Sequence, residues 1–131
     1  MSIKNLTIEL TGKMPSLNEV IDTSRRNKFA GNRLKQEIQK DLEMQIFQQI
    51  RSKGIYENLP FENVVDFDIV YIEANAKRDK DNIASSKKFI FDALVSRGVL
   101  KNDTWKYVGN FTEKFIIGSD YKVIITMTER E

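Results

Sequence analysis

The sequence contains no cysteine and no histidine among its 131 residues. Without thiolate or imidazole groups, the chain cannot build a zinc site from sulfur and nitrogen ligands, and it has neither a cysteine nucleophile nor a histidine base. Any metal chemistry must therefore use oxygen ligands, which suit Mg²⁺ and Mn²⁺. The lack of cysteine also agrees with an intracellular location.

Long apolar runs are missing as well. No run approaches the roughly 18 residues that a membrane-spanning helix needs, and the N-terminus lacks the basic, apolar and small-residue succession of a secretory signal. We therefore expect a cytoplasmic protein with no membrane partner. Because 40% of the residues are hydrophobic, which is enough for one core, we expect residues 1–131 to form a single domain.

Positive charge is concentrated in two segments, although the net charge is only +2. Residues 24–53 contain eight basic and three acidic side chains, and residues 76–106 contain eight basic and four acidic ones. Basic side chains around carboxylates are typical of nucleases, whereas a solvated helix face is the structural alternative. We predict DNA contacts at the following residues: Arg25, Arg26, Lys28, Arg33, Lys35, Lys77, Arg78 and Lys80.

The hydrophobic pattern predicts a mixed α/β (α+β) fold. Strands are expected over about 3–11, 65–73, 105–117 and 121–128, and helices over about 32–53 and 82–98. Residues 18–31 are expected to form a DNA-facing loop that begins with a short helix. One sheet of about four strands covered by two helices would accommodate this order of elements.

The helix expected over 82–98 carries a lysine on its apolar side. Lys87 falls in the middle of the apolar stripe, and Lys88 lies at its border near Asp92. Such a lysine often extends its ammonium group to water, but here the helix begins beside two aspartates. Either lysine is therefore a candidate to contact a phosphate.

Three aspartates are predicted to converge on a divalent cation: Asp79, Asp81 and Asp103. An EF-hand loop beginning at Asp79 is excluded, because Ile90 stands where the loop needs glutamate. Sugar-nucleotide transferases and phosphoaspartyl phosphatases use similar aspartates but need a larger domain. A structural role, with Asp81 or Asn82 capping a helix, remains open at this stage.

The order of these motifs resembles the RusA family of Holliday junction resolvases. The chain shows Asp-x-Asp-Asn at 79–82, a lysine-bearing helix leading to Asp-Ala-Leu at 92–94, and Asp103 eleven residues beyond Asp92. Pro-Ser-Leu-Asn at 15–18 is similar to the Pro-Ser-x-Asn element that follows the first strand in that family. The resemblance covers nearly the whole chain.

The resemblance implies a homodimeric endonuclease, typically encoded by a phage or prophage, that nicks opposing strands of a four-way DNA junction in the bacterial cell. Asp79, Asp81 and Asp103 would bind Mg²⁺, with Mn²⁺ as a substitute, and a lysine would act beside them. The chain departs from the family pattern at Ser85, where the usual lysine is missing, so that both Lys87 and Lys88 remain candidates.

Roles remain to be assigned to two aromatic residues, and three rival functions remain open for the chain. Phe29 is a candidate wedge between bases, whereas Trp105 is expected to be the core-facing start of a strand, with base stacking as its alternative role. The rival functions are a Mg²⁺-dependent nuclease for other branched DNA, a non-catalytic DNA-binding module, and a structural or protein-binding domain.

Overall fold

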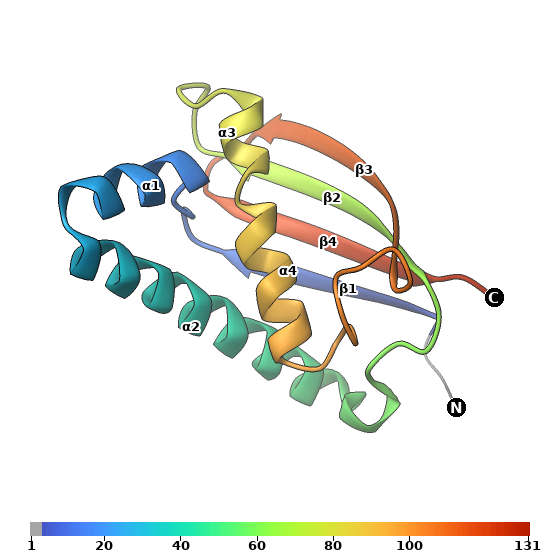
Figure 1. Ribbon diagram of the computed structural model, residues 1–131. Helices are drawn as coiled ribbons and strands as arrows, with labels where there is room; N and C mark the ends of the chain where they lie inside the picture. The colour runs from blue at the N-terminus through green and yellow to red at the C-terminus, as the bar shows by residue number, and fades with distance from the viewer. Residues whose placement is uncertain (1–3) are drawn as a thin grey trace.

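Four strands form one mixed sheet, and the helices lie on one of its faces (Figure 1). A computed structural model describes residues 4–131. The elements follow in this order: β1 (Asn5–Thr11), α1 (Leu17–Arg26), α2 (Lys28–Lys53), a 3₁₀ turn (Tyr56–Asn58), β2 (Val65–Glu73), α3 (Lys80–Ala84), α4 (Lys87–Ser96), β3 (Val108–Ile117) and β4 (Lys122–Glu129). Among these described helices, none is long and apolar enough to cross a membrane.

The strand order across the sheet is β1-β4-β2-β3. β4 is antiparallel to both β1 and β2, whereas β2 and β3 are parallel. The mixed α/β prediction and its four strands are therefore confirmed. Because β2 and β3 are parallel, their carboxyl ends meet at one end of the sheet, beside α3 (Figure 1).

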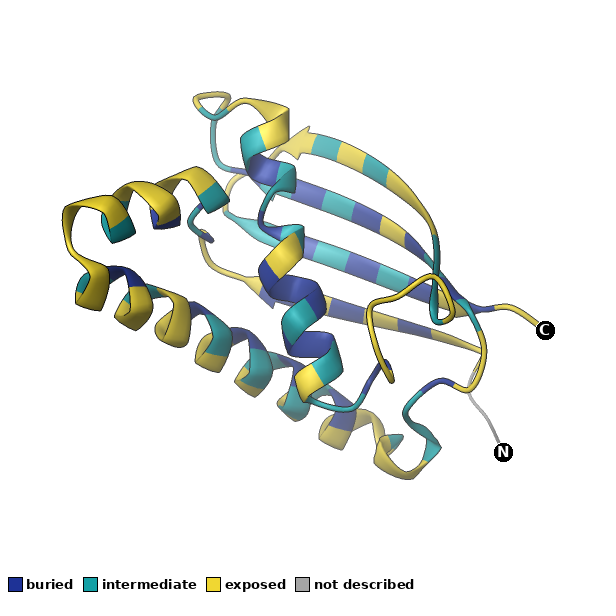
Figure 2. Ribbon diagram, viewed as in Figure 1, coloured by how far each residue is buried: buried dark blue, intermediate teal, exposed yellow. Residues whose placement is uncertain are grey.

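The core lies between the sheet and the helices. Alternate residues of the two central strands and β1 face the helices and are buried, as period-two patterning requires (Figure 2). α2 contributes a stripe of four buried aliphatic side chains, at Ile38, Leu42, Ile46 and Ile50. Each such side chain contributes about 1.5–3 kcal/mol by leaving water.

Residues 18–31 form a helical hairpin, so the short helix predicted at the start of this segment is confirmed and the loop predicted after it is wrong. Asn27 ends α1 and begins α2, because its side chain accepts hydrogen bonds from the amides of Phe29 and Ala30. Gly31 lies inside α2 at the crossing of the two helices. A Cβ atom there would overlap Ser24, which is why only glycine allows this close approach.

The helix predicted over 82–98 is broken into α3 and α4. Ser85 and Ser86 lie between them, and their hydroxyl groups donate to the carbonyl oxygens of Asn82 and Ile83 at 2.6 and 2.9 Å. Such local bonds compete with helical main-chain bonds and allow the chain to bend. The break turns α3 toward the end of the sheet.

The two outer strands of the sheet differ in whether side chains form hydrogen bonds with the main-chain groups of their outer edges. On β1, Gln49 bonds to both main-chain groups of Glu9, and Gln45 bonds to both main-chain groups of Thr11, over 2.6–3.1 Å. These α2 glutamines thus occupy the edge as a neighbouring strand would. No equivalent pair of side chains covers the outer edge of β3 in the part of the chain that the structure describes.

Trp105 is not in a strand, so its prediction as a core-facing strand residue is wrong. β3 begins only at Val108, and Trp105 is 96% exposed. The preceding residues form a turn in which the Tyr107 amide donates to the Thr104 carbonyl at 3.0 Å. Because of this turn, β3 begins later in the sequence than predicted, and the indole of Trp105 lies in solvent.

Candidate functional site

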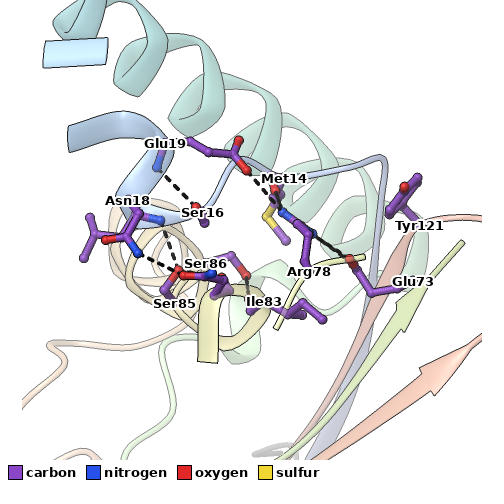
Figure 3. A network of polar contacts seen from close by, with 12 residues as sticks. Met14, Ser16, Asn18, Glu19, Glu73, Arg78, Ile83, Ser85, Ser86 and Tyr121 are labelled. Atoms are coloured by element: carbon purple, nitrogen blue, oxygen red, sulfur yellow. Dashed lines mark hydrogen bonds and ion pairs between the residues drawn. The ribbon is translucent and has the colours of Figure 1, made fainter. Parts of the chain in front are cut away.

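A buried ion pair anchors the segment that carries the Asp-x-Asp-Asn motif. β2 ends at Glu73, whose buried carboxylate accepts two hydrogen bonds of 2.9 Å from Arg78 (Figure 3). The same guanidinium donates to the carbonyl of Met14 at 2.7 Å and lies 3.9 Å from the carboxylate of Glu19. Arg78 therefore ties the end of β2 to the β1–α1 connection.

The function predicted for Arg78, a DNA contact, is corrected by this geometry. Its side chain is mostly buried, and its donors are directed to protein acceptors. The hydrogen bonds that the guanidinium donates to the Glu73 carboxylate raise the pKa of the guanidinium above its usual value, so the group stays charged. Arg78 positions the site and is not free to bind phosphate.

Two motifs far apart in the sequence meet beside this anchor. The side-chain amide of Asn18 donates to the side-chain oxygen of Asn82 at 2.9 Å, and the amide of Leu17 donates to the hydroxyl of Ser85 at 3.0 Å. Ser16, which is buried, caps α1 by accepting from the amide of Glu19 at 3.2 Å. The Pro-Ser-Leu-Asn segment and α3 therefore hold each other in place.

Asp79 and Asp81 are exposed at the start of α3. Asp79 is the residue that precedes the helix, yet its side chain makes no capping bond. Neither carboxylate is hydrogen-bonded or ion-paired within residues 4–131. The structural role considered for Asp81 or Asn82, capping of this helix, is therefore not observed, and both aspartates are available to a ligand.

A pocket of about 320 Å³ lies beside Asp79, at the carboxyl ends of β2 and β3. Its lining includes Asp79, Lys80, Asn75, Phe115 and Ile117. The ammonium nitrogen of Lys80 lies 5.8 Å from the centre of the Phe115 ring, which directs its charge over β3. Cationic and anionic groups thus border the same pocket.

The two candidate lysines of α4 point in different directions. Lys87 is 24% exposed and lies over β3, where its ammonium group is 2.9 Å from a carboxylate oxygen of Glu113 and 5.1 Å from the centre of the Phe111 ring. Lys88 is 62% exposed and pairs with Asp92 on the outer surface at 3.3 Å. Of the two, Lys87 shares a face of β3 with Lys80.

The position of Lys87 is fixed by a hydrogen-bond network, through Glu113 to Tyr71, that the sequence analysis missed. The buried hydroxyl of Tyr71 donates to the second carboxylate oxygen of Glu113 at 2.8 Å, and burial, reinforced by Glu113, raises the pKa of that hydroxyl. Glu113 lies between Phe111 and Phe115 on the side of β3 that faces the helices. A carboxylate at an inward position of an aromatic strand was the signal available in the sequence.

Asp103 does not join Asp79 and Asp81 within one chain, so the predicted convergence of the three carboxylates is corrected for the monomer. Asp103 precedes β3 and lines a hollow with Trp105 and Phe111, whereas the α3 aspartates lie where β3 ends. Ten strand residues separate these ends, a distance of about 30 Å at roughly 3.3 Å per residue. Figure 1 shows the α4–β3 connection and α3 at opposite ends of the sheet.

The donor set of a single chain still fits one hard cation. Within residues 4–131, no group of three or more acidic side chains is close enough to hold a metal ion. Mg²⁺ keeps several water ligands and is often bound by only one or two carboxylates. Asp79 and Asp81 satisfy that lower requirement.

The remaining predicted DNA contacts lie on exposed surface. Lys77 precedes the aspartates and Lys80 stands between them, and five more basic residues lie on the α1–α2 hairpin: Arg25, Arg26, Lys28, Arg33 and Lys35. α1 begins at the Asn18 contact and leads to this hairpin over about 15 Å, at 1.5 Å per residue. Phe29, which is 79% exposed, projects from the same hairpin.

The chain was compared with protein-family models and with curated proteins. No protein-family model matches the chain, and no curated protein matches it.

Proposed function

We propose that this chain is a Mg²⁺-dependent, structure-selective endodeoxyribonuclease of the RusA type, which resolves four-way DNA junctions by paired nicks. The observation that supports this most is the contact between Asn18 and Asn82. It joins the two sequence motifs on which the resemblance rests and leaves Asp79 and Asp81 unpaired beside lysines. A structural or protein-binding domain has no need of this arrangement.

The proposed roles follow from the positions of the side chains. Asp79 and Asp81 hold the cation, and Mn²⁺ substitutes for Mg²⁺. When bound, the metal ion lowers the pKa of a ligated water and neutralises charge on the phosphate. Lys80 places positive charge over β3 beside Asp79, where it attracts the scissile phosphate, and Lys87, which is paired with Glu113, remains a second candidate to contact the phosphate.

The exposed basic hairpin is proposed to bind the arms of the junction. Arg25, Arg26 and Lys28 would contact phosphates, giving affinity that falls as salt is raised. Such contacts position DNA without reading its sequence. A four-way junction has two equivalent strands to cut, so we propose a homodimer acting on DNA in the bacterial cytoplasm.

Strand-labelled four-way junction and matched linear duplex test the proposal when each is incubated with the protein in Mg²⁺ and in Ca²⁺. We expect paired nicks in the junction with Mg²⁺ and none with Ca²⁺, whose larger and more variable coordination supports such chemistry poorly. Equal cutting of both substrates would contradict junction selectivity. Cutting of flaps or forks in preference to junctions would support a nuclease for other branched DNA.

A single substitution separates cleavage from binding. Asp81→Asn removes one ligand charge, and we expect cleavage to fall at least about 100-fold, corresponding to several kcal/mol of lost transition-state stabilisation. Junction binding should remain or tighten, because a negative charge facing phosphate is lost. Asp92→Asn makes the same charge change on the outer surface of α4 and should leave cleavage intact. Binding by both variants with no cleavage even by the unsubstituted protein would favour a non-catalytic DNA-binding module.

A further inference from the structure

α2 carries a second stripe of side chains, on the side of the helix that faces away from the sheet (Figure 2). Its buried aliphatic stripe recurs every four residues from Ile38 to Ile50. At about 100° per residue, Lys40, Met44 and Arg51 lie roughly half a turn around the helix from that stripe. Met44 is 53% exposed in the middle of this second stripe. The outward face of α2 is therefore apolar at its centre and basic on either side.

A hollow of about 360 Å³ lies on this face, where α4 ends beside the second half of α2 (Figure 1). α2 supplies most of its lining, and Arg97 is contributed by the end of α4. The guanidinium of Arg97 lies over the ring of Phe47, 4.3 Å from its centre, and the hydroxyl of Ser96 donates to the carboxylate of Glu43. These contacts hold the end of α4 against α2, so the walls of the hollow are fixed.

A second hollow, of about 190 Å³, adjoins the first one at Arg97, which lines both. It is bordered by Tyr56, whose ring is 66% exposed and lies 6.5 Å from the ring of Phe47. We call the two hollows together the α2–α4 groove. Lys40 and Arg51 are about 16 Å apart along α2, at 1.5 Å per residue. An extended peptide of about five residues covers this length.

The charge of the α2–α4 groove is positive. Three cationic side chains line the larger hollow, at Lys40, Arg51 and Arg97. Within residues 4–131, none of the three has a carboxylate partner. Glu43, the one carboxylate among the described lining residues, accepts a hydrogen bond from Ser96. A ligand that carries carboxylates would therefore meet three unpaired cations around an apolar floor.

We infer that the α2–α4 groove binds a short acidic segment of another protein. An aromatic or large aliphatic side chain of that segment contacts Met44, and its carboxylates pair with the three cations. Methionine, arginine and aromatic side chains are the ones enriched where proteins bind proteins. Methionine is also flexible and polarizable, so it adapts to apolar side chains of different shape. This inference does not depend on the proposed function.

Single-stranded DNA is the other anionic ligand that a basic groove can bind, and it does so by stacking its bases on open aromatic faces. Phe47 is the one aromatic ring among the described residues that line the larger hollow, and Arg97 already lies over it. Asp79 and Asp81 precede α4, whereas the groove lies where α4 ends, and this helix alone is about 15 Å long. We therefore expect an acidic peptide and a DNA junction to bind at the same time.

Selection from a library of random peptides displayed on phage tests the inference without assuming a partner sequence. Counter-selection on the double variant Met44→Ser, Arg51→Gln removes peptides that bind elsewhere. We expect the retained peptides to combine aspartate or glutamate with an aromatic or large aliphatic residue. One of them, labelled and titrated by fluorescence anisotropy, should bind each single variant at least about tenfold more weakly, as is usual when a principal interface contact is lost.

Lys53→Gln is the matched control for Arg51→Gln. It removes a positive charge two residues further along α2, outside the lining of both hollows. The affinity for the peptide should be unchanged in this variant. Met44 and Arg51 are exposed, so their substitution should leave the fold intact, and thermal unfolding of each variant measures this.

The inference would be overturned if no peptide survives counter-selection, or if the surviving peptides lack acidic residues. A labelled oligothymidylate distinguishes the DNA surface. We expect it neither to displace the peptide nor to bind Arg51→Gln more weakly than Lys53→Gln. Displacement of the peptide, by this strand or by an unlabelled four-way junction, would assign the groove to DNA and overturn the inference. Because no step measures cleavage, failure of the proposed nuclease activity would leave this test intact.

Discussion

At the scale of single residues, the ion pair between Arg78 and Glu73 determines where the candidate site is held. Both groups are largely removed from water and bonded in a bidentate manner. Removing one member leaves the other charge buried without a partner, which is far more unfavourable than removing both. The pair is therefore a sensitive point of the fold.

Arg78→Met should lower the free energy of unfolding by about 3 kcal/mol, because Glu73 is left charged and buried. Urea denaturation of this variant and of the double variant Glu73→Gln, Arg78→Met measures the effect. The double variant should recover much of the loss. Equal stability of the single and double variants would show that the buried charge is not the cause.

Asp66 gives a pH-dependent prediction. Its hydrogen bonds from Arg130, and then from the amide of Asn110, lower the pKa of its carboxyl group from 3.8 to about 2. A group with a lowered folded pKa stabilises the fold above its unfolded value, so this contribution should be complete above about pH 4 and lost as the pH falls toward 2. A carboxyl NMR titration measures the pKa, and Arg130→Gln should raise it toward its ordinary value.

At the scale of elements, the α1–α2 crossing depends on Gly31. Gly31→Ala improves helix propensity by about 1 kcal/mol but forces a Cβ atom against Ser24, and overpacking costs about 1–3 kcal/mol. We expect a net loss of stability in thermal unfolding. Asn32→Ala, at the exposed next position, should be neutral or stabilising. A stabilised Gly31→Ala variant would mean that the helices separate without penalty.

The sequence predicted the elements better than their ends and joints. Alternation in Val65–Glu73 and the four-residue spacing from Ile38 to Ile50 report burial directly, so β2 and the core of α2 were found. The α1–α2 joint was missed because Asn27 serves two helices at once, and the break at Ser85 because serine hydroxyl groups act locally. Neither feature alters hydrophobic periodicity.

The candidate site was predictable only in part for a related reason. Asp79 and Asp81 are only two positions apart in the sequence, so their proximity needed no knowledge of the fold. Placing Asp103 required the direction of β3, and the parallel pairing of β2 with β3 is a long-range property. Glu113, which pairs with Lys87, alternates with Phe111 and Phe115, and this pattern was the signal in the sequence that was overlooked.

At the scale of the whole molecule, the basic hairpin lies apart from the aspartates, so binding and cleavage should separate. Arg25→Gln with Arg26→Gln should reduce the slope of log affinity against log salt by about 2 and weaken all junction sequences alike. Titration of labelled junction at several salt concentrations measures this. Lys53→Gln, at the far end of α2, is the control and should leave the slope unchanged.

The glutamines on β1 limit how large an assembly of this sheet can become. A sheet with two open edge strands can pair with further molecules at both edges and so grow into a fibre. Here Gln45 and Gln49 terminate one border, so a strand from another molecule can be added only at the β3 border, and two molecules joined there could add no third. Replacing both glutamines by valine would remove that stop, and light scattering would then rise with protein concentration where the unsubstituted protein reaches a plateau.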